Sequence, residues 1–185
     1  MSHAFLEQPL SVFLDRVASE EPAPGGGACA AVTVGLAAGL CAMAARFSTS
    51  TVADAATVVE QAEALRQRVQ GLAEKDAEAY TQVLQAFALP RTPDPDARRQ
   101  RITAALSAAA EPPLEVAEVA VDVGRLARRL EAEGNPNLRG DAVTGRLLAE
   151  AGCRAAVELV AANLPEGAPR REHAQALADS WAQAG

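Results

Sequence analysis

The chain has 185 residues, a formal net charge of −7 at pH 7 and only 3% aromatic residues. A chain of this length is expected to form one domain, residues 1–185, with a substantial core. The acidic charge disfavours a nucleic-acid partner, because no basic patch would offset phosphate repulsion. The cysteines form no C-x-x-C pair and the two histidines lie near opposite termini, which disfavours a disulfide framework or a bound metal. We expect Cys29, Cys41 and Cys153 to be small core residues.

Apolar residues at helical spacing run through almost the whole chain, and no alternating strand pattern of useful length is present. Prolines and glycines separate the helical stretches, and Asp54 is a candidate N-cap. The predicted helices cover residues 6–19, 28–47, 55–89, 96–111, 114–133, 141–164 and 169–183. These elements predict an all-α bundle of about six or seven helices.

The stretch 28–45 carries no charge and just reaches the lower length limit for crossing a bilayer. Ala and Gly supply much of it and insert weakly, so we expect the buried helix of a soluble protein; a membrane-associated protein is the alternative. The N-terminus lacks a basic region followed by a hydrophobic one, which predicts a cytoplasmic location. Gly35 and Gly39 suit close helix contact. Flanking helices alone would not cover this stretch, which predicts a homodimer.

Three places are candidates for chemistry. The first is Pro24-Gly25-Gly26-Gly27, where backbone without Cβ atoms leads into the first turn of a helix and suits an anionic or electron-rich ligand. An ordinary tight turn is the alternative.

The second candidate is Asp76, which shares a helix face with Tyr80 one turn away. Tyr80 belongs to the predicted inner face of the helix 55–89, with Val58, Leu65, Val69, Leu72, Val83, Leu84 and Phe87. Asp76 should then point inward or toward a cleft and have a raised pKa suited to proton transfer. A solvated surface carboxylate is the alternative.

The third candidate is the turn that holds Asn135, Asn137 and Asp141. Its plain interpretation is a helix C-cap, a turn and the N-cap of the next helix.

In order, these segments resemble the cyclodeaminase/cyclohydrolase family of folate enzymes. The matching segments are Pro-Gly-Gly-Gly at 24–27, Asp-Ala-Glu-Ala-Tyr at 76–80 with Leu-Pro at 89–90, Pro-Leu-Glu-Val-Ala-Glu at 113–118 and the Gly-Asn-x-Asn segment at 134–142. The resemblance spans residues 6 to about 164.

The resemblance implies an all-helical homodimer that binds a tetrahydrofolate derivative as substrate and needs no metal or other cofactor. Members close 5-formimidoyltetrahydrofolate to 5,10-methenyltetrahydrofolate with loss of ammonia, or hydrolyse the methenyl form. By motif, Asp76 is the catalytic acid/base. The substrate-binding residues would be Pro24, Gly25, Gly26, Gly27, Asn135, Asn137 and Asp141.

Two positions depart from the family pattern, in which serines usually stand where this chain has Ala28 and Gly140. Each change removes a hydroxyl that could bond to substrate or to a water. We therefore expect cyclodeamination, which uses no water. Methenyltetrahydrofolate cyclohydrolase is one alternative, and a catalytically inactive helical dimer or scaffold of the same fold is another.

Overall fold

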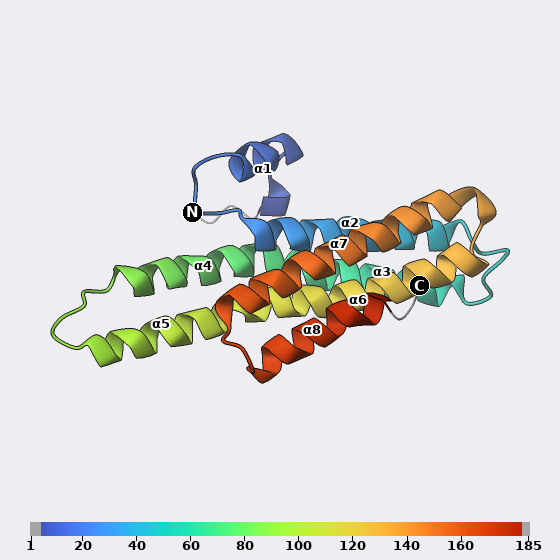
Figure 1. Cartoon of the computed structure of the whole chain (residues 1–185). Coiled ribbons are helices and arrows are strands. Elements are labelled where there is room, and N and C mark those ends of the chain that lie inside the picture. Colours follow the sequence, from blue (N-terminus) through green and yellow to red (C-terminus); the bar gives the residue numbers. More distant parts are fainter. Residues whose placement is uncertain (1–4, 183–185) are drawn as a thin grey trace.

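The computed structural model describes residues 5–182, which form eight α-helices and two short 3₁₀ helices and contain no strand. The helices are η1 (Phe5–Glu7), α1 (Leu10–Val17), α2 (Gly26–Arg46), α3 (Ala55–Gln70), α4 (Leu72–Ala88), α5 (Pro95–Ala109), α6 (Glu111–Glu133), η2 (Pro136–Leu138), α7 (Arg139–Asn163) and α8 (Pro169–Ala182). The all-α fold predicted from the sequence is confirmed (Figure 1).

The predicted long helix over 55–89 is two helices, because the chain breaks at Gly71 between α3 and α4. Glycine is among the poorest residues at continuing a helix, since it loses the most backbone entropy. This break accounts for the count of eight rather than six or seven. Pro112 and Pro113 lie in the first turn of α6, where the N–H groups that proline lacks have no partner within the helix.

Helix α2 packs on α3, α4, α6 and α7. Small residues allow a close approach: a Cβ on Gly145 of α7 would lie 3.3 Å from the carbonyl oxygen of Ala37, and one on Gly152 would overlap Val34. Within residues 5–182, α2 is the one helix long and apolar enough to cross a membrane, and 56% of its most apolar window is buried inside the bundle. It therefore has the packing of a core helix. Cys41 and Cys153 are buried as predicted, whereas Cys29 is only half-buried.

The outer parts of α4 and α5 project beyond the rest of the bundle as a hairpin (Figure 1). Three residues predicted for the inner face lie there, and that prediction was wrong: Tyr80, Leu84 and Phe87 are 44%, 40% and 50% exposed. Helical periodicity identifies an apolar face, but only α5 is available to cover it at this distance from the core. Val58, Val69, Leu72 and Val83, nearer the core or facing α5, are buried.

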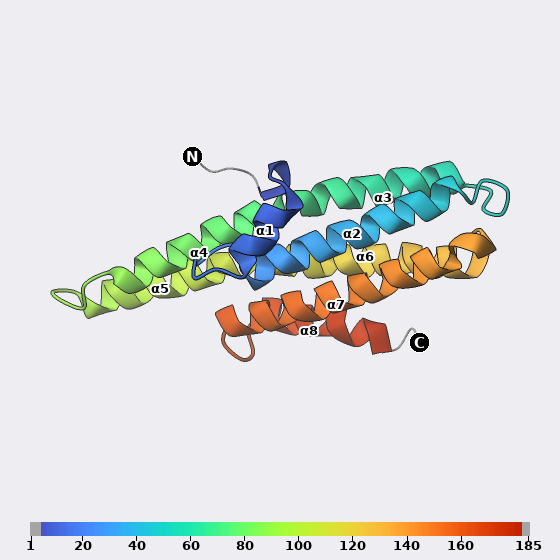
Figure 2. The ribbon, with the colours of Figure 1, turned by 90° about the horizontal axis from the view of Figure 1, so that it is seen from above.

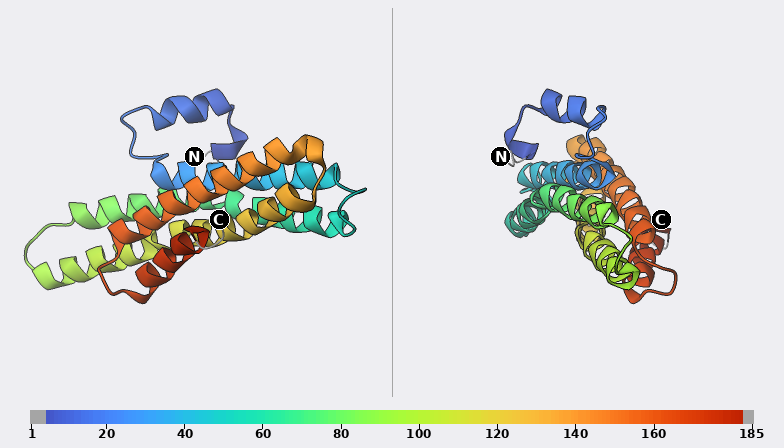
Figure 3. Two further views of the ribbon diagram at one scale, coloured as in Figure 1. Left: turned by 45° about the vertical axis from the view of Figure 1, so that its right-hand side comes forward. Right: turned by 90° about the vertical axis from the view of Figure 1, so that its left-hand side faces the viewer.

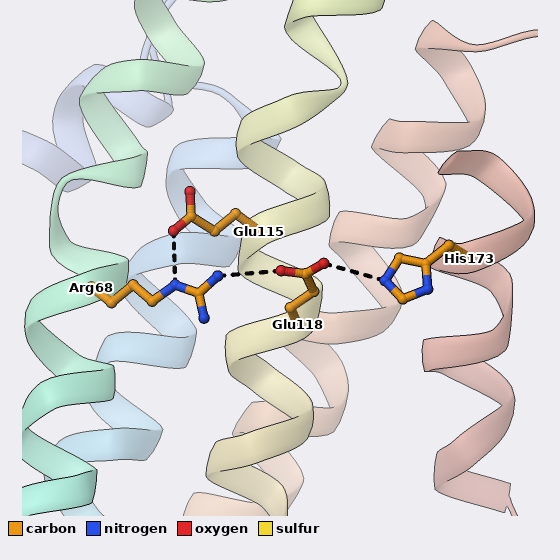
Figure 4. A network of polar contacts seen from close by, with 4 residues as sticks. All are labelled: Arg68, Glu115, Glu118 and His173. Atoms are coloured by element: carbon orange, nitrogen blue, oxygen red, sulfur yellow. Dashed lines mark hydrogen bonds and ion pairs between the residues drawn. The ribbon is translucent and has the colours of Figure 1, made fainter. Parts of the chain in front are cut away.

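Ion pairs join helices on the outside of the bundle. Arg68 of α3 donates to Glu115 of α6 at 2.8 Å and to Glu118 at 3.2 Å, and Glu118 also contacts His173 of α8 at 3.2 Å (Figure 4). Asp54 was predicted to cap α3. Instead it makes no side-chain cap and pairs with Arg129 of α6, which lowers the pKa of its carboxyl.

Helix α1 stands apart from the bundle and lies over one end of α2 (Figures 1 and 3). Phe5 and Phe13 anchor the segment by an edge-to-face contact and are both buried. The backbone N–H of Phe5 also donates to Glu74 of α4 at 2.6 Å. These contacts hold the N-terminal segment beside the first turn of α4, one turn before Asp76.

Candidate active site

Asp76 lies against the N-terminus of α2. A Cβ on Gly27 would overlap the carboxyl group of Asp76, so the absence of a side chain at residue 27 creates the space that this carboxyl occupies. The backbone N–H of Ala28 donates to the carboxyl. Gly25, the residue before α2, has no side chain to cap the helix, so Asp76 supplies from α4 the acceptor that a helix N-terminus requires.

The environment of Asp76 favours its protonated form. Burial raises the pKa of the Asp76 carboxyl, and the bond from the Ala28 N–H opposes part of that rise. A carboxyl with a raised pKa both takes up and releases a proton more readily near neutral pH than a solvated one. The placement in a cleft was predicted correctly, although the reason was wrong, because Tyr80 is exposed rather than buried.

Asp76 opens into a cavity of about 340 Å³ between α2, α4 and the ends of α5 and α7. Gly25, Gly26 and Gly27 form one wall and Tyr80 lines another, whereas the substrate-binding role of the glycines stays a prediction. Leu159 and Asn163 of α7 and Ala109 of α5 also line the cavity, and the rest of the lining is Pro22, Ala23, Ala77 and Ala162. Pro24 is buried outside this lining. The cavity is small and mostly apolar, with a few polar groups, as sites for small molecules commonly are.

Sequence reasoning missed Leu159 and Asn163. They lie at the last turns of α7, and α7 runs antiparallel to α2, so its end reaches the glycine segment that begins α2 (Figure 1). A Cβ on Gly26 would meet Leu159 at 3.7 Å, which is ordinary contact. The pairing of two helix ends distant in sequence is a tertiary feature that carries no local signal.

The turn with Asn135, Asn137 and Asp141 lies at the opposite end of α2. The side chain of Asn135 donates to the carbonyl of Phe47 at 3.0 Å, and its backbone N–H donates to Ser48 Oγ at 2.9 Å. A helix of the length of α2 spans about 30 Å. The structure therefore does not bring these three residues together with Asp76 in one chain, and their binding role stays a prediction.

Cys29 lies near Asp76 on the first turns of α2. Burial and the charge of Asp76 raise the pKa of its thiol, which keeps the thiol protonated. A thiol in this state is a poor nucleophile. Asp76 is therefore the group in this cavity best suited to exchange a proton with a bound molecule.

Comparison with known proteins agrees with this geometry. The sequence profile of the formiminotransferase-cyclodeaminase family matches residues 9–180. The chain belongs to this family. The resemblance inferred from the motifs is thus confirmed, and with it the prediction of an enzyme of the folate cyclodeaminase/cyclohydrolase class.

Two relatives of this chain are informative. The chain is 33% identical over 96% of its length to the methenyltetrahydrofolate cyclohydrolase of Methylorubrum extorquens, and it covers 91% of that protein. It also matches the crystal structure of formiminotetrahydrofolate cyclodeaminase from Thermotoga maritima with a TM-score of 0.82 and 27% identity, over 96% of this chain and 93% of that one. The two relatives are named for different reactions of tetrahydrofolate.

Proposed function

We propose that this protein is a formimidoyltetrahydrofolate cyclodeaminase, which converts 5-formimidoyltetrahydrofolate to 5,10-methenyltetrahydrofolate and ammonia. The observation that carries the proposal is the Asp76 carboxyl in a glycine-walled cavity of a member of this family. The reaction requires no metal or redox cofactor, and the tetrahydrofolate derivative is the only ligand we propose.

Asp76 acts as a proton shuttle in the proposed reaction. The substrate enters with its formimidoyl nitrogen protonated, as an amidinium cation. N10 attacks the formimidoyl carbon, the C–N10 bond forms as the C=N π bond opens to leave an amino group, and N10 gives its proton to the Asp76 carboxylate. The carboxylic acid then passes this proton to the formimidoyl nitrogen. The bond from carbon to that nitrogen breaks and ammonia leaves, while the lone pairs of N5 and N10 stabilise the methenyl cation.

The composition of the cavity supports deamination. Its polar side chains are Asp76, Tyr80 and Asn163, and Asp76 is the one carboxyl among them. Transfer of a proton between two nitrogens of one substrate needs a single acid/base and no ordered water. Ala28 is 0% exposed, and Gly140, the second residue of α7, lies at the far end of the bundle, so within one chain neither position lines the cavity. In the dimer proposed below, Gly140 would approach the site together with the turn that holds Asn135.

Methenyltetrahydrofolate cyclohydrolase is the second candidate, and the 33% identity to a protein of that name favours it. In that reaction the Asp76 carboxylate would take a proton from a water as it attacks the methenyl carbon. The Asp76 carboxyl would then give that proton to N5 as the C–N5 bond breaks, and the added hydroxyl would lose its proton to solvent as the C=O bond of the formyl group forms on N10.

An ultraviolet assay separates the two reactions. Purified protein is incubated with 5-formimidoyltetrahydrofolate, and methenyl absorbance and released ammonia are followed together. Their rise in equal amounts supports cyclodeamination. Loss of methenyl absorbance from added methenyltetrahydrofolate, without ammonia formation from the formimidoyl substrate, would establish the cyclohydrolase. No turnover and no folate binding would indicate the inactive scaffold.

We also propose that the protein acts as a homodimer that pairs through α2. Leu36, at the middle of α2, is 60% exposed, and it lines an apolar groove of about 510 Å³ with Gly35, Gly39 and Leu40. Seen from above, α2 lies open between α3 and α7 beyond the part that α1 covers (Figure 2). An exposed apolar groove of this kind is typical of an interaction surface.

Antiparallel pairing of the α2 helices of two copies would also explain how the turn with Asn135, which is distant from Asp76 within one chain, takes part in the site. A two-fold axis near Leu36, the midpoint of α2, would place the C-terminal end of the partner's α2 beside the glycine end of this one. The turn with Asn135 lies at that C-terminal end. The predicted binding residues would then approach Asp76 from the second copy.

A further inference from the structure

Asn163 is a polar residue of the cavity to which the sequence assigned no role. It is the last residue of α7, and its Nδ2 donates to the carbonyl of Ala109 at 3.3 Å. Ala109 is the last residue of α5, where helix carbonyls lack partners within the helix. This bond sets the orientation of the carboxamide, because the reversed amide would direct Oδ1 at the carbonyl oxygen.

The fixed carboxamide leaves two groups for a ligand. Oδ1 has no partner among the described residues, and it is accessible, because the only buried side-chain nitrogen or oxygen without a partner in residues 5–182 is Trp181 Nε1. Nδ2 has a second hydrogen beyond the one given to Ala109. Asn163 therefore offers one acceptor and one donor side by side at the edge of the cavity.

A carboxamide edge of this kind pairs with a cyclic amide, whose N–H and C=O also lie side by side. The pterin ring of tetrahydrofolate has such an edge, formed by N3–H and the oxygen on C4. Each of the two hydrogen bonds contributes modestly to the binding free energy. A ligand that leaves the carboxamide oxygen or N–H unpaired loses more binding free energy than that.

We propose that Asn163 is the specificity-determining residue that recognises the N3–H/C4=O edge of the pterin ring. Oδ1 accepts from N3–H, and Nδ2 donates to the C4 oxygen. The inference rests on the proposed function, since it assigns the orientation of a folate in the same cavity.

This orientation also serves the reaction. The C4 oxygen and N5 lie on the same side of the pterin ring, so a ring held by its C4 edge keeps N5 and its one-carbon group next to the point of attachment. Asn163 and Asp76 line the same cavity of about 340 Å³. Recognition of the ring edge would therefore place the reacting carbon where the Asp76 carboxyl can exchange a proton with its substituents.

The test compares two probes that differ only at the recognised edge. These are tetrahydrofolate and its 2,4-diamino analogue, which has an amino group on C4 and no hydrogen on N3. Dissociation constants are measured by calorimetry for the wild-type chain and for Asn163→Leu and Asn163→Asp. Arg171→Leu is the matched control, because Arg171 donates to the carbonyl of Leu164 at 3.0 Å and stabilises the same corner without lining the cavity.

The wild-type chain and Arg171→Leu should prefer tetrahydrofolate by roughly tenfold or more. Asn163→Leu should remove the preference. Asn163→Asp should shift the ratio further toward the analogue, because a carboxylate repels the C4 oxygen and accepts from a C4 amino group. A purely structural Asn163 would weaken both probes equally and leave the ratio unchanged, which would overturn the inference alone. Failure of the wild-type chain to bind tetrahydrofolate would overturn the proposed function and this inference with it.

Discussion

The carboxyl group of Asp76 on α4 fills the space that a side chain on Gly27 of α2 would need. The same carboxyl accepts the N–H of Ala28, so the glycine both admits the acid and brings it to the helix N-terminus. The glycine segment is thus required for the position of the acid as well as for a wall of the cavity.

Gly27→Ala should displace the Asp76 carboxyl and lower turnover by roughly 10²-fold, because small displacements of a reacting group are costly. It should also lower the free energy of unfolding by about 1–3 kcal/mol through overpacking. Gly71→Ala is the control, since a Cβ there meets nothing within 4 Å, its φ of −76° suits any residue, and Gly71 does not line the cavity. Equal turnover in the two variants, measured by methenyl absorbance, would contradict the role of Gly27.

Asp76→Asn keeps the shape of the side chain and can still accept the Ala28 N–H, but it cannot exchange a proton. Turnover should fall by roughly 10²-fold or more while folate binding persists. Steady-state rates and calorimetric dissociation constants check this. A variant with wild-type turnover would remove Asp76 from the mechanism.

The same substitution should change how stability depends on pH. The folded state raises the pKa of Asp76, so the folded chain holds this proton more tightly than the unfolded chain. The contribution of Asp76 to stability is full below its unfolded pKa of about 3.9 and is lost as the pH rises through its higher folded pKa. Asp76→Asn should therefore gain in relative stability as the pH rises above about 4 and until it passes the raised folded pKa of Asp76. Denaturant titrations of both chains across this range measure the difference, and a constant difference would contradict the shift.

Leu36→Glu should convert the proposed dimer to a monomer, because it places a charge in the centre of the apolar groove on α2. Sedimentation at micromolar concentration measures the change. Leu84→Glu is the control, because Leu84 is 40% exposed on the projecting hairpin and does not line the groove. A wild-type chain that sediments as a monomer would overturn the dimer itself.

Ser48→Ala should destabilise the far end of the bundle by about 1–3 kcal/mol, because it leaves a donor unpaired. Ser48 is fully buried; its hydroxyl donates to the carbonyl of Ala44 at 2.7 Å and accepts from the Asn135 N–H at 2.9 Å. Thr144→Ala is the matched control, since the exposed Thr144 hydroxyl bonds only to the carbonyl one turn earlier. Chemical denaturation of both variants compares them, and equal losses would contradict the buried role of Ser48.

Local signals in the sequence predicted most of the helices. The spacing of apolar residues, together with Pro and Gly at the boundaries, placed α2, α6 and α7 within a few residues of where they lie. The same signals did not reveal the break at Gly71, since a single glycine inside a periodic pattern is often tolerated. The motif resemblance identified Asp76 and the glycine segment, and both line one cavity.

The tertiary arrangement decided the rest. Periodicity identified the apolar face that carries Tyr80 and Phe87, but their exposure depends on how far α4 extends past its neighbours. Asn163 resembles any asparagine at the end of a helix until the antiparallel packing of α7 on α2 brings it to the glycine segment. The turn with Asn135 lies far from Asp76 because the two are at opposite ends of α2, and the rise of a helix of this length holds its ends about 30 Å apart. Helix formation depends on interactions within a few residues, which the sequence displays directly, whereas a site depends on which helix ends meet.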